Sequence, residues 1–216
     1  MHEIARSVLP GELVFDIGAH AGSKAQWFAD RGARVIAVEP QPAMIEKLRV
    51  RFDGNPNVTV VPKGLAGEPG ELTMRINTQA PTISTFTEHW TKGRFSDMVW
   101  DDQAIVQVTT LDQLVSEYGA PRYTKIDVEG FEKSVMLGLT RRIGAISFEF
   151  TTEFEAEARD IMWYARGLGY RHFNFSLGEA EEYALADWAD VETAIAHLKG
   201  ACAADSDAWG DVYVSA

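Results

Sequence analysis

Two carboxylates stand one residue apart in the stretch from Tyr123 to Gly130, which reads YTKIDVEG. The stretch is apolar enough to end a buried strand, yet charges at its tip do not stabilise a strand. Because side chains alternate along a strand, Asp127 and Glu129 can point into one site. Like charges so close together raise the pKa of one group, which suits a general base. We therefore take Asp127 and Glu129 as the candidate catalytic residues.

A glycine-containing turn follows the first predicted strand, in the stretch Phe15–Ser23, FDIGAHAGS. Gly18 and Gly22 allow a tight turn and a close approach of the backbone to a ligand. The spacing is not the G-x-G-x-x-G of nicotinamide-binding dehydrogenases, and Asp16 would repel a pyrophosphate. A carboxylate at this point suits a ligand that brings a cation to the turn.

The second predicted strand ends in Val38-Glu39-Pro40, 23 residues after Asp16. An acid at this place can accept both hydrogen bonds of a ribose diol. The alternative is that Asp16 caps its own turn and that Glu39 is a solvated strand end. A ribose, a cationic group and a glycine turn together describe S-adenosylmethionine.

These residues must be positioned by an alternating series of strands and helices. We expect five βα units in succession, which form a parallel sheet with helices on both faces. Their strands are predicted at residues 12–17, 34–38, 58–62, 122–128 and 145–150. Ligands of such sheets bind beyond the carboxyl ends of the strands. The pairs Ser23/Gln26, Thr110/Gln113 and Thr152/Glu155 have the spacing of helix capping boxes.

Two regions depart from this alternation. Residues 67–109 form a long insertion before the fourth strand, and we expect this insertion to cover the substrate site. Its aromatic residues His89, Trp90 and Trp100 either cover an acceptor or pack the insertion onto the body. Between the last strands, at residues 170–175 and 211–215, we expect only a short helix over Val191–Leu198. Because this is not a crossover helix of ordinary length, the two strands suggest a hairpin at one edge. The whole chain, residues 1–216, is predicted to be a single doubly wound α/β domain.

Composition excludes several classes of partner. The 216 residues carry a net charge of −12, which repels nucleic acids and anionic lipid surfaces. The single cysteine allows no intrachain disulfide, and no stretch of sequence has the length or apolarity of a signal peptide or membrane span. We expect a cytoplasmic protein with a small-molecule partner, and the sequence leaves its oligomeric state open.

The segments FDIGAHAG, VIAVEP, LDQL and KIDVEGFE resemble, in order and spacing, the FkbM-like branch of the class I S-adenosylmethionine-dependent methyltransferases. The resemblance runs from about Glu12 to Phe150. It implies a mostly parallel, Rossmann-like seven-stranded sheet whose last strand is antiparallel. It also implies methyl transfer to a hydroxyl of a sugar or natural-product type of acceptor.

The resemblance places the cofactor at a defined set of residues. His20 stands where the family usually has Asn, and Ser84 matches a small-hydroxyl segment more loosely. The predicted cofactor-binding residues are Asp16, Gly18, Ala19, His20, Gly22, Glu39, Pro40 and Ser84.

The catalytic roles remain open at this level. Either Glu129 or Asp127 takes the proton of the acceptor, and the other orients substrate or cofactor. A Mg²⁺ ion held by these carboxylates is a weaker alternative, since spacing identifies no third ligand. Glu149, at the end of the next strand, is a third candidate for the floor of the pocket. The competing functions are a non-catalytic S-adenosylmethionine-binding module and a methyltransferase with a macromolecular acceptor.

Overall fold

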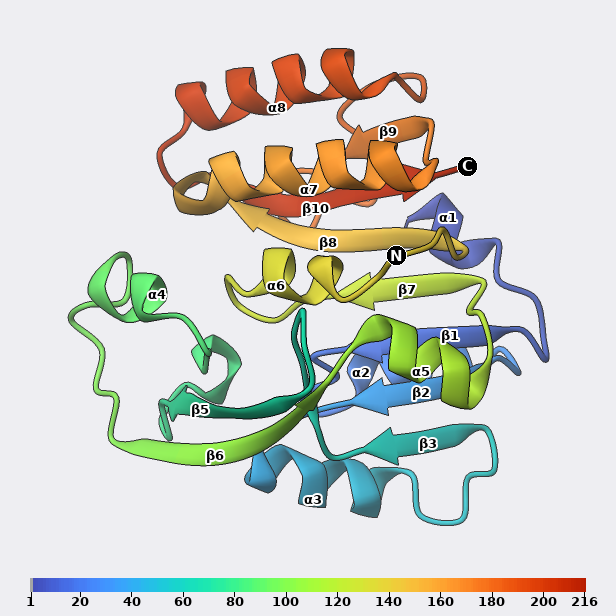
Figure 1. The fold of residues 1–216 in the computed structure, drawn as a ribbon, viewed down its shortest axis with the longest axis vertical. Coiled ribbons are helices and arrows are strands. Elements are labelled where there is room, and N and C mark those ends of the chain that lie inside the picture. Colours follow the sequence, from blue (N-terminus) through green and yellow to red (C-terminus); the bar gives the residue numbers. More distant parts are fainter. Residues whose placement is uncertain (1) are drawn as a thin grey trace.

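Short runs of valine, isoleucine, phenylalanine and alanine form a seven-stranded sheet in the computed structural model, which describes residues 2–216 (Figure 1). β10 pairs antiparallel with both of its neighbours, and the remaining pairings are parallel. The predicted sheet with an antiparallel last strand is confirmed. In spatial order the strands are β3 (Val58–Val61), β2 (Arg34–Val38), β1 (Leu13–Ile17), β7 (Tyr123–Ile126), β8 (Ala145–Thr151), β10 (Trp209–Ser215) and β9 (His172–Phe175).

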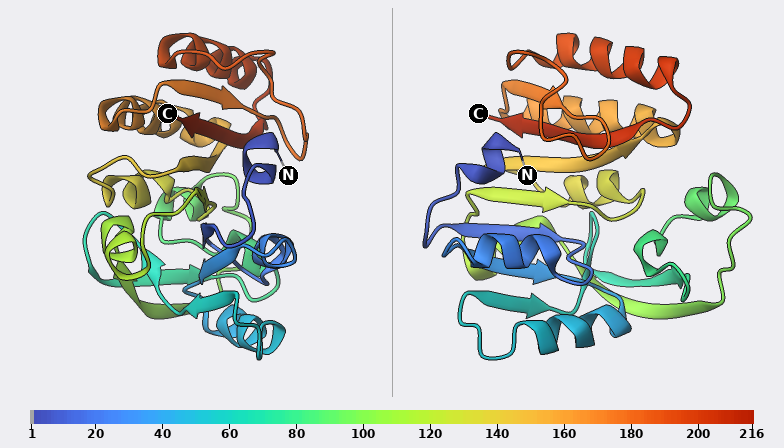
Figure 2. Two further views of the ribbon diagram at one scale, coloured as in Figure 1. Left: turned by 90° about the vertical axis from the view of Figure 1, so that its right-hand side faces the viewer. Right: turned by 180° about the vertical axis from the view of Figure 1, so that it is seen from behind.

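Helices cover both faces of this sheet (Figure 2). One apolar cluster joins Phe15 of β1 and Phe148 of β8 to the helices in the C-terminal half of the chain. The other joins Val14 and Val35 to Phe28. The helices of the first face are α5 (Leu111–Tyr118), α6 (Glu132–Leu137), α7 (Glu155–Leu168) and α8 (Val191–Ala204), and those of the opposite face are α1 (Glu3–Arg6), α2 (Ser23–Ala29) and α3 (Pro42–Arg51).

The insertion folds as a small unit beyond the carboxyl ends of the parallel strands (Figure 1). A second, three-stranded sheet has the order β4-β6-β5. Its strands are β4 (Gly64–Leu65), β5 (Gly70–Ile76) and β6 (Asp102–Thr109), and between the last two lie the 3₁₀ turn η1 (Pro81–Ile83) and the short helix α4 (Glu88–Lys92). Trp90 of α4 is buried and packs against Phe154, so this aromatic residue attaches the insertion to the body.

Two predicted capping boxes are wrong. Ser23 is the first residue of α2, after Gly22, and its side chain caps nothing. Thr152 opens a 3₁₀ turn, η2 (Thr152–Phe154), and its hydroxyl donates to backbone carbonyls of the α8–β10 connection. The predicted cap by Thr110 is confirmed, because its Oγ1 accepts a hydrogen bond from Gln113 N. The side chain of Gln113 accepts its hydrogen bond from Thr109 Oγ1, so only half of the box forms.

The predicted hairpin at the edge also needs correction. β9 and β10 do pair antiparallel at one edge of the sheet. They are joined, however, through α8, a helix of 14 residues. The helix was underestimated because Gly200 and the alanines around it hide its apolar periodicity. Across residues 2–216, the structure contains no helix that combines the length and the apolarity needed to cross a membrane.

Candidate active site

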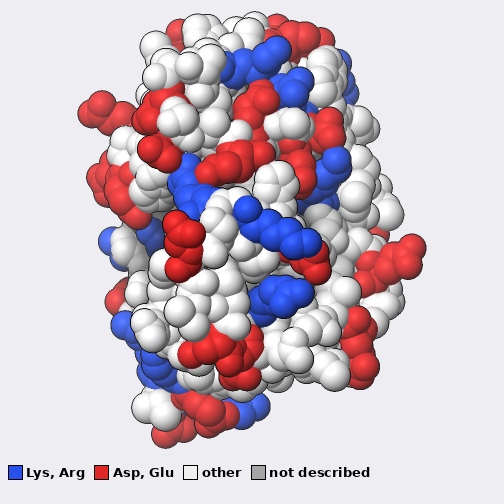
Figure 3. Space-filling view, turned by 90° about the vertical axis from the view of Figure 1, so that its left-hand side faces the viewer, with Lys and Arg blue, Asp and Glu red and all other residues white. Residues whose placement is uncertain are grey.

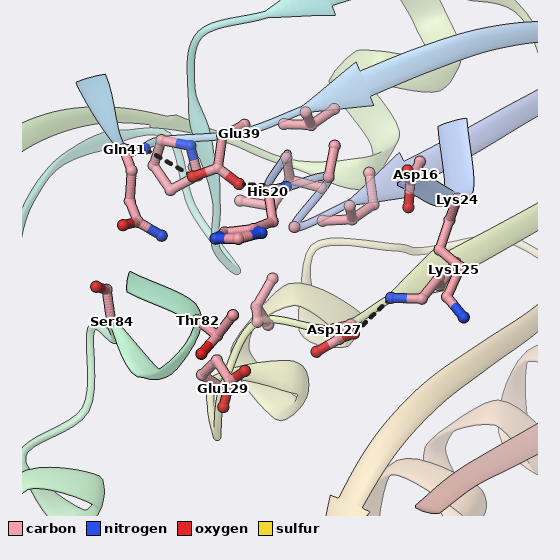
Figure 4. A pocket seen from close by; sticks show the side chains of 18 of the residues that line it. Asp16, His20, Lys24, Glu39, Gln41, Thr82, Ser84, Lys125, Asp127 and Glu129 are labelled. Carbon is pink, nitrogen blue, oxygen red and sulfur yellow. Dashed lines mark hydrogen bonds and ion pairs between the residues drawn. The ribbon is translucent and has the colours of Figure 1, made fainter. Parts of the chain in front are cut away.

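A cavity lies at the carboxyl ends of β1, β2 and β7, and encloses about 920 Å³ of empty space with its mouth included. Figure 4 shows it between the turn after β1 and the loop after β7. The structure brings nine of the ten predicted residues together on its walls, and these nine are Asp16, Gly18, Ala19, His20, Glu39, Pro40, Ser84, Asp127 and Glu129. Gly22 does not line the cavity.

The two predicted glycines serve different contacts. At Gly18, φ is +80° and an added Cβ would lie 1.8 Å from the backbone oxygen of Asp127. The turn after β1 therefore crosses the end of β7 at a distance that only glycine permits. At Gly22, φ is +83° and an added Cβ would lie 2.7 Å from the Phe52 ring. Gly22 thus packs the turn onto α3.

Glu39 is held in place by the backbone around it. Its side chain is buried, and it accepts hydrogen bonds of 2.8 Å from the backbone N–H groups of His20 and Gln41. Burial raises the pKa of Glu39 to about 7, although these two hydrogen bonds oppose the shift. Each carboxylate oxygen has a further lone pair, so the fixed group can still accept hydrogen bonds from a diol.

His20 occupies a left-handed backbone conformation with φ of +47°. Asn and Gly adopt this region more readily than other residues, which gives a physical reason for the usual residue of the family at this place. The ring nitrogen Nε2 is buried and has no hydrogen-bond partner in the described part of the chain. Burial and the nearby Lys47 lower the pKa of His20, so its ring is neutral at pH 7.

A buried ion pair stands beside the turn. Lys125 Nζ lies 2.6 Å from Asp127 Oδ2, and only 7% of Lys125 is exposed. Burial lowers the pKa of Lys125, but Asp127, Asp16 and Asp211 outweigh it and raise the pKa. Asp16 itself is 1% exposed, and within residues 2–216 neither of its carboxylate oxygens has a hydrogen-bond partner. Burial raises the pKa of Asp16 although the nearby Lys125 opposes the shift, so the cavity contains a buried carboxyl group whose charge is only partly compensated.

Glu129 is aimed into the cavity by an unusual backbone. Its φ is +56°, and its carbonyl oxygen accepts a 2.7 Å hydrogen bond from Thr85 Oγ1 of the insertion. Glu132 closes the same turn, because its Oε1 accepts a hydrogen bond from Val128 N. Burial, Asp127 and Glu132 together raise the pKa of Glu129 to about 9. At neutral pH the ligand-free site therefore favours the protonated form of Glu129.

A third carboxylate belongs to the same cluster. Glu149 of β8 has a side-chain oxygen within 4.8 Å of oxygens of both Asp127 and Glu129. Burial, Asp127 and Glu129 raise the pKa of Glu149 well above its usual value. Along residues 2–216, the carboxylates of Glu129 and Glu149 have neither a hydrogen bond nor an ion pair. Acidic clusters of this kind are common without a metal, so the cluster alone does not indicate one.

Several residues of the cavity were not predicted from the sequence. Lys125, whose ammonium group pairs with Asp127, is one of them. Met74, Thr82 and Phe86 of the insertion also line the cavity. Gln41 Nε2 donates to Pro81 O and so ties the wall of the cavity to the insertion. Local sequence patterns give no signal for such contacts, because they depend on how the insertion folds back.

The donor set fits S-adenosylmethionine. Glu39 offers fixed acceptors for a ribose diol, Asp16 offers an unpartnered buried carboxylate for a cationic group, and Gly18 leaves the turn open. A model of the FkbM methyltransferase domain matches residues 16–172. The chain belongs to this family. Membership places the chain among S-adenosylmethionine-dependent methyltransferase domains.

Individual relatives match the chain only at low identity or over a short stretch. The chain is 27% identical over 141 residues to the hexuronic acid methyltransferase AglP of Haloferax volcanii, covering 63% of this chain and 54% of the relative. It is 36% identical over 58 residues to a protein of Methanosarcina acetivorans named probable ribosomal RNA small subunit methyltransferase A, covering 27% of this chain and 22% of the relative. The chain thus spans about half of the first relative and less of the second.

Solved structures share the fold. The FkbM methyltransferase of Methylobacillus flagellatus KT superimposes with a TM-score of 0.52 at 16% identity, covering 94% of this chain and 43% of that one. The precorrin-6y C5,15-methyltransferase of Geobacter metallireducens GS-15 also gives a TM-score of 0.52, at 11% identity, covering 98% of this chain and 85% of that one. The class I methyltransferase fold expected from the sequence is confirmed.

Proposed function

We propose that the chain transfers the methyl group of S-adenosylmethionine to a hydroxyl oxygen of a small sugar or natural-product type of acceptor. The observation that carries the proposal is the carboxylate cluster of Asp127 and Glu129 on the wall of the cavity that Asp16 and Glu39 also line. A hydroxyl group that enters beside this cluster meets both a base and the place expected for the cofactor.

We assign the base to Glu129. Asp127 is engaged by Lys125, whereas the carboxylate of Glu129 is free of such a partner in the described chain. Bound S-adenosylmethionine would supply a methyl group on a sulfonium with a good leaving group. Glu129 would then accept the proton of the hydroxyl, and Asp127 would keep the acceptor oriented. A cation in the cavity lowers the pKa of Glu129, because it stabilises the ionised form.

A small acceptor is favoured by the charge of the molecule. The net charge is −12, and Figure 3 shows acidic and basic side chains interspersed on the face that bears the insertion and the carboxyl ends of the parallel strands. This face therefore presents no continuous basic surface of the kind that binds nucleic-acid backbones. The relative AglP, by its name, acts on a hexuronic acid. We propose that the insertion, residues 67–109, covers the acceptor as well as lining the cavity.

The proposal is tested first by binding and then by turnover. Isothermal titration with S-adenosylhomocysteine should show one site on the wild-type protein. An acceptor found by transfer of a labelled methyl group then allows comparison of Glu129→Gln with wild type. We expect the variant to bind S-adenosylhomocysteine normally and to lose turnover by roughly 10²- to 10⁴-fold, the usual contribution of a positioned base. Full turnover by this variant would remove the assignment of the base.

Glu149 gives the metal alternative a specific test. Together with Asp127 and Glu129 it gives three carboxylates that could hold a metal ion. Sequence spacing alone did not identify this third ligand. Methyl transfer that survives dialysis against EDTA supports Glu129 as a metal-independent base. Loss of methyl transfer that Mg²⁺ restores would instead support a metal bound by the three carboxylates.

A further inference from the structure

The cavity has two chemically different ends. Figure 4 shows Glu39, Gln41 and Ser84 on one side, and Asp16, Lys24 and Lys125 on the other. The first end offers carboxylate and amide groups, which suit the hydroxyls and the base of a nucleoside. The second end holds two lysines, the buried Asp16, and Asp127 in its ion pair with Lys125. Apart from that pair, Asp16 and Lys24 suit the two opposite charges of an amino acid.

The two lysines differ in how they are engaged. Lys125 is in an ion pair with Asp127 at 2.6 Å. Lys24, the second residue of α2, is half-buried, and within residues 2–216 it makes neither a hydrogen bond nor an ion pair. Its ammonium group is near enough to Asp16 to lower the pKa of that carboxyl group against the effect of burial. Lys24 is therefore the available cation at this end of the cavity.

A second cavity continues the space beyond the lysines. Its empty space is about 420 Å³ with open solvent included, and both Lys24 and Lys125 line it as well as the main cavity. Asp211 and Tyr213 of β10 form part of its wall, and Tyr213 donates a hydrogen bond to Asp211. The two lysines thus stand between the main cavity and this second hollow.

We propose that Lys24 binds the α-carboxylate of the methionine arm of the cofactor, with Asp16 facing its α-amino group. This inference rests on the proposed function, because it assumes an S-adenosylmethionine site. A ribose bound at Glu39 would direct the amino-acid arm of the ligand along Gly18 toward Asp16 and Lys24, which line the opposite end of the cavity. An ammonium beside a carboxylate in a half-buried place gives a charge-assisted hydrogen bond.

Truncated ligands separate this role from a general effect on the cavity. 5′-Methylthioadenosine keeps the adenosine and the thioether but lacks the amino-acid arm. Decarboxylated S-adenosylmethionine lacks only the carboxylate. We expect Lys24→Met to weaken binding of S-adenosylhomocysteine by roughly 10- to 100-fold, as the loss of one charged hydrogen bond implies. Binding of 5′-methylthioadenosine should stay within about twofold, because its contacts do not include Lys24.

Lys24→Met should also abolish the preference of the protein for a ligand that carries the α-carboxylate. Wild-type protein is expected to bind S-adenosylmethionine more tightly than its decarboxylated analogue, and Lys24→Met to bind the two about equally. Lys24→Arg should restore most of the preference, because it keeps a cation at the site. Lys199→Met is the matched control, since Lys199 is exposed on α8 and lines neither cavity. Circular dichroism checks that each variant is folded.

The outcomes are distinguishable. Unchanged affinity of Lys24→Met for S-adenosylhomocysteine would overturn the role of Lys24 and leave the proposed function standing. An equal loss of affinity for 5′-methylthioadenosine would also overturn it, because the effect would then reach the whole cavity. Wild-type protein that binds none of these ligands would overturn the proposed function and this inference with it.

Discussion

Gly18 is a position of the site where the surrounding backbone leaves no space for a side chain. We predict that Gly18→Ala lowers the affinity for S-adenosylhomocysteine at least tenfold and destabilises the fold, because a Cβ would lie 1.8 Å from Asp127 O. Gly11→Ala is the control: its φ is +84°, but nothing lies within 4 Å of an added Cβ. It should cost about 1 kcal/mol of backbone strain and leave binding intact. Thermal unfolding and isothermal titration would show the difference, and equal effects of the two variants would contradict the steric argument.

We expect Asp16 to lower the stability of the ligand-free fold and to strengthen binding of the cofactor. In the ligand-free protein it is buried and unpartnered among the described residues, so Asp16→Asn removes a poorly solvated acid without changing shape. We predict that the variant unfolds at a temperature at least equal to that of wild type at pH 8, and binds S-adenosylhomocysteine at least tenfold more weakly. The exposed Asp53→Asn should change neither quantity. A marked drop in melting temperature for Asp16→Asn would contradict this account.

Single residues also mark the limit of what the sequence reveals about the site. Asp16, Glu39 and Asp127 could be predicted to meet because each lies at the carboxyl end of a parallel strand, and those strand ends share one edge of the sheet. The pairing of Lys125 of β7 with Asp127 and the lack of a partner for Lys24 of α2 could not be predicted, since lysine side chains are usually solvated. The left-handed backbone of Glu129 depends on Thr85, which is 44 residues away in the chain.

At the scale of elements, buried parallel strands were the most predictable. β2 was predicted with the bounds that it has, because Arg34–Val38 is a short apolar run buried on both faces. α8 was predicted too short, and α2 lacks the expected cap. The pairing of β4 with β6 could not be predicted, because β4 is two residues long and has no pattern of its own.

The attachment of the insertion depends on α4. Trp90 is 3% exposed with its ring centroid 5.3 Å from that of Phe154, and nearby Arg94 pairs with Glu153 at 2.5 Å. We predict that Trp90→Ala speeds amide hydrogen exchange in residues 86–100 by tenfold or more, while β1 and β7 keep their protection. The reason is that the indole supplies most of the apolar contact of this short helix.

A surface tryptophan provides the control for that experiment. Trp163 of α7 is 48% exposed, so Trp163→Ala removes a ring of the same size without opening a buried contact. It should leave exchange in the insertion unchanged. If Trp90→Ala also left exchange in residues 86–100 unchanged, the insertion would have to be held by its other contacts, such as that of Thr85 with Glu129.

For the whole molecule, the concentration of acids in the site should make stability depend on pH. The folded-state pKa is about 7 for Glu39 and Glu132 and about 9 for Glu129, all above the ordinary value of 4.5. Between these limits the folded protein keeps protons that the unfolded chain has released. Unfolding then releases protons, and the free energy of unfolding falls as pH rises from 4.5 toward 9. His2 and His20, whose pKa values are lowered, oppose this fall only below about pH 6.5.

The window from pH 7 to 9 covers the titration of Glu129, whose neighbour Glu149 also has a raised pKa. We predict that the melting temperature of the ligand-free protein falls across this window, and that Glu129→Gln reduces the slope by at most about 1.4 kcal/mol of unfolding free energy per pH unit. Glu192→Gln, at an exposed position of α8, should leave the slope unchanged. S-Adenosylmethionine should flatten the slope more than S-adenosylhomocysteine, because only its sulfonium favours the ionised carboxylates. A slope that is the same for wild type and Glu129→Gln would mean that Glu129 is already ionised at neutral pH, and its neighbours would then have to hold the proton.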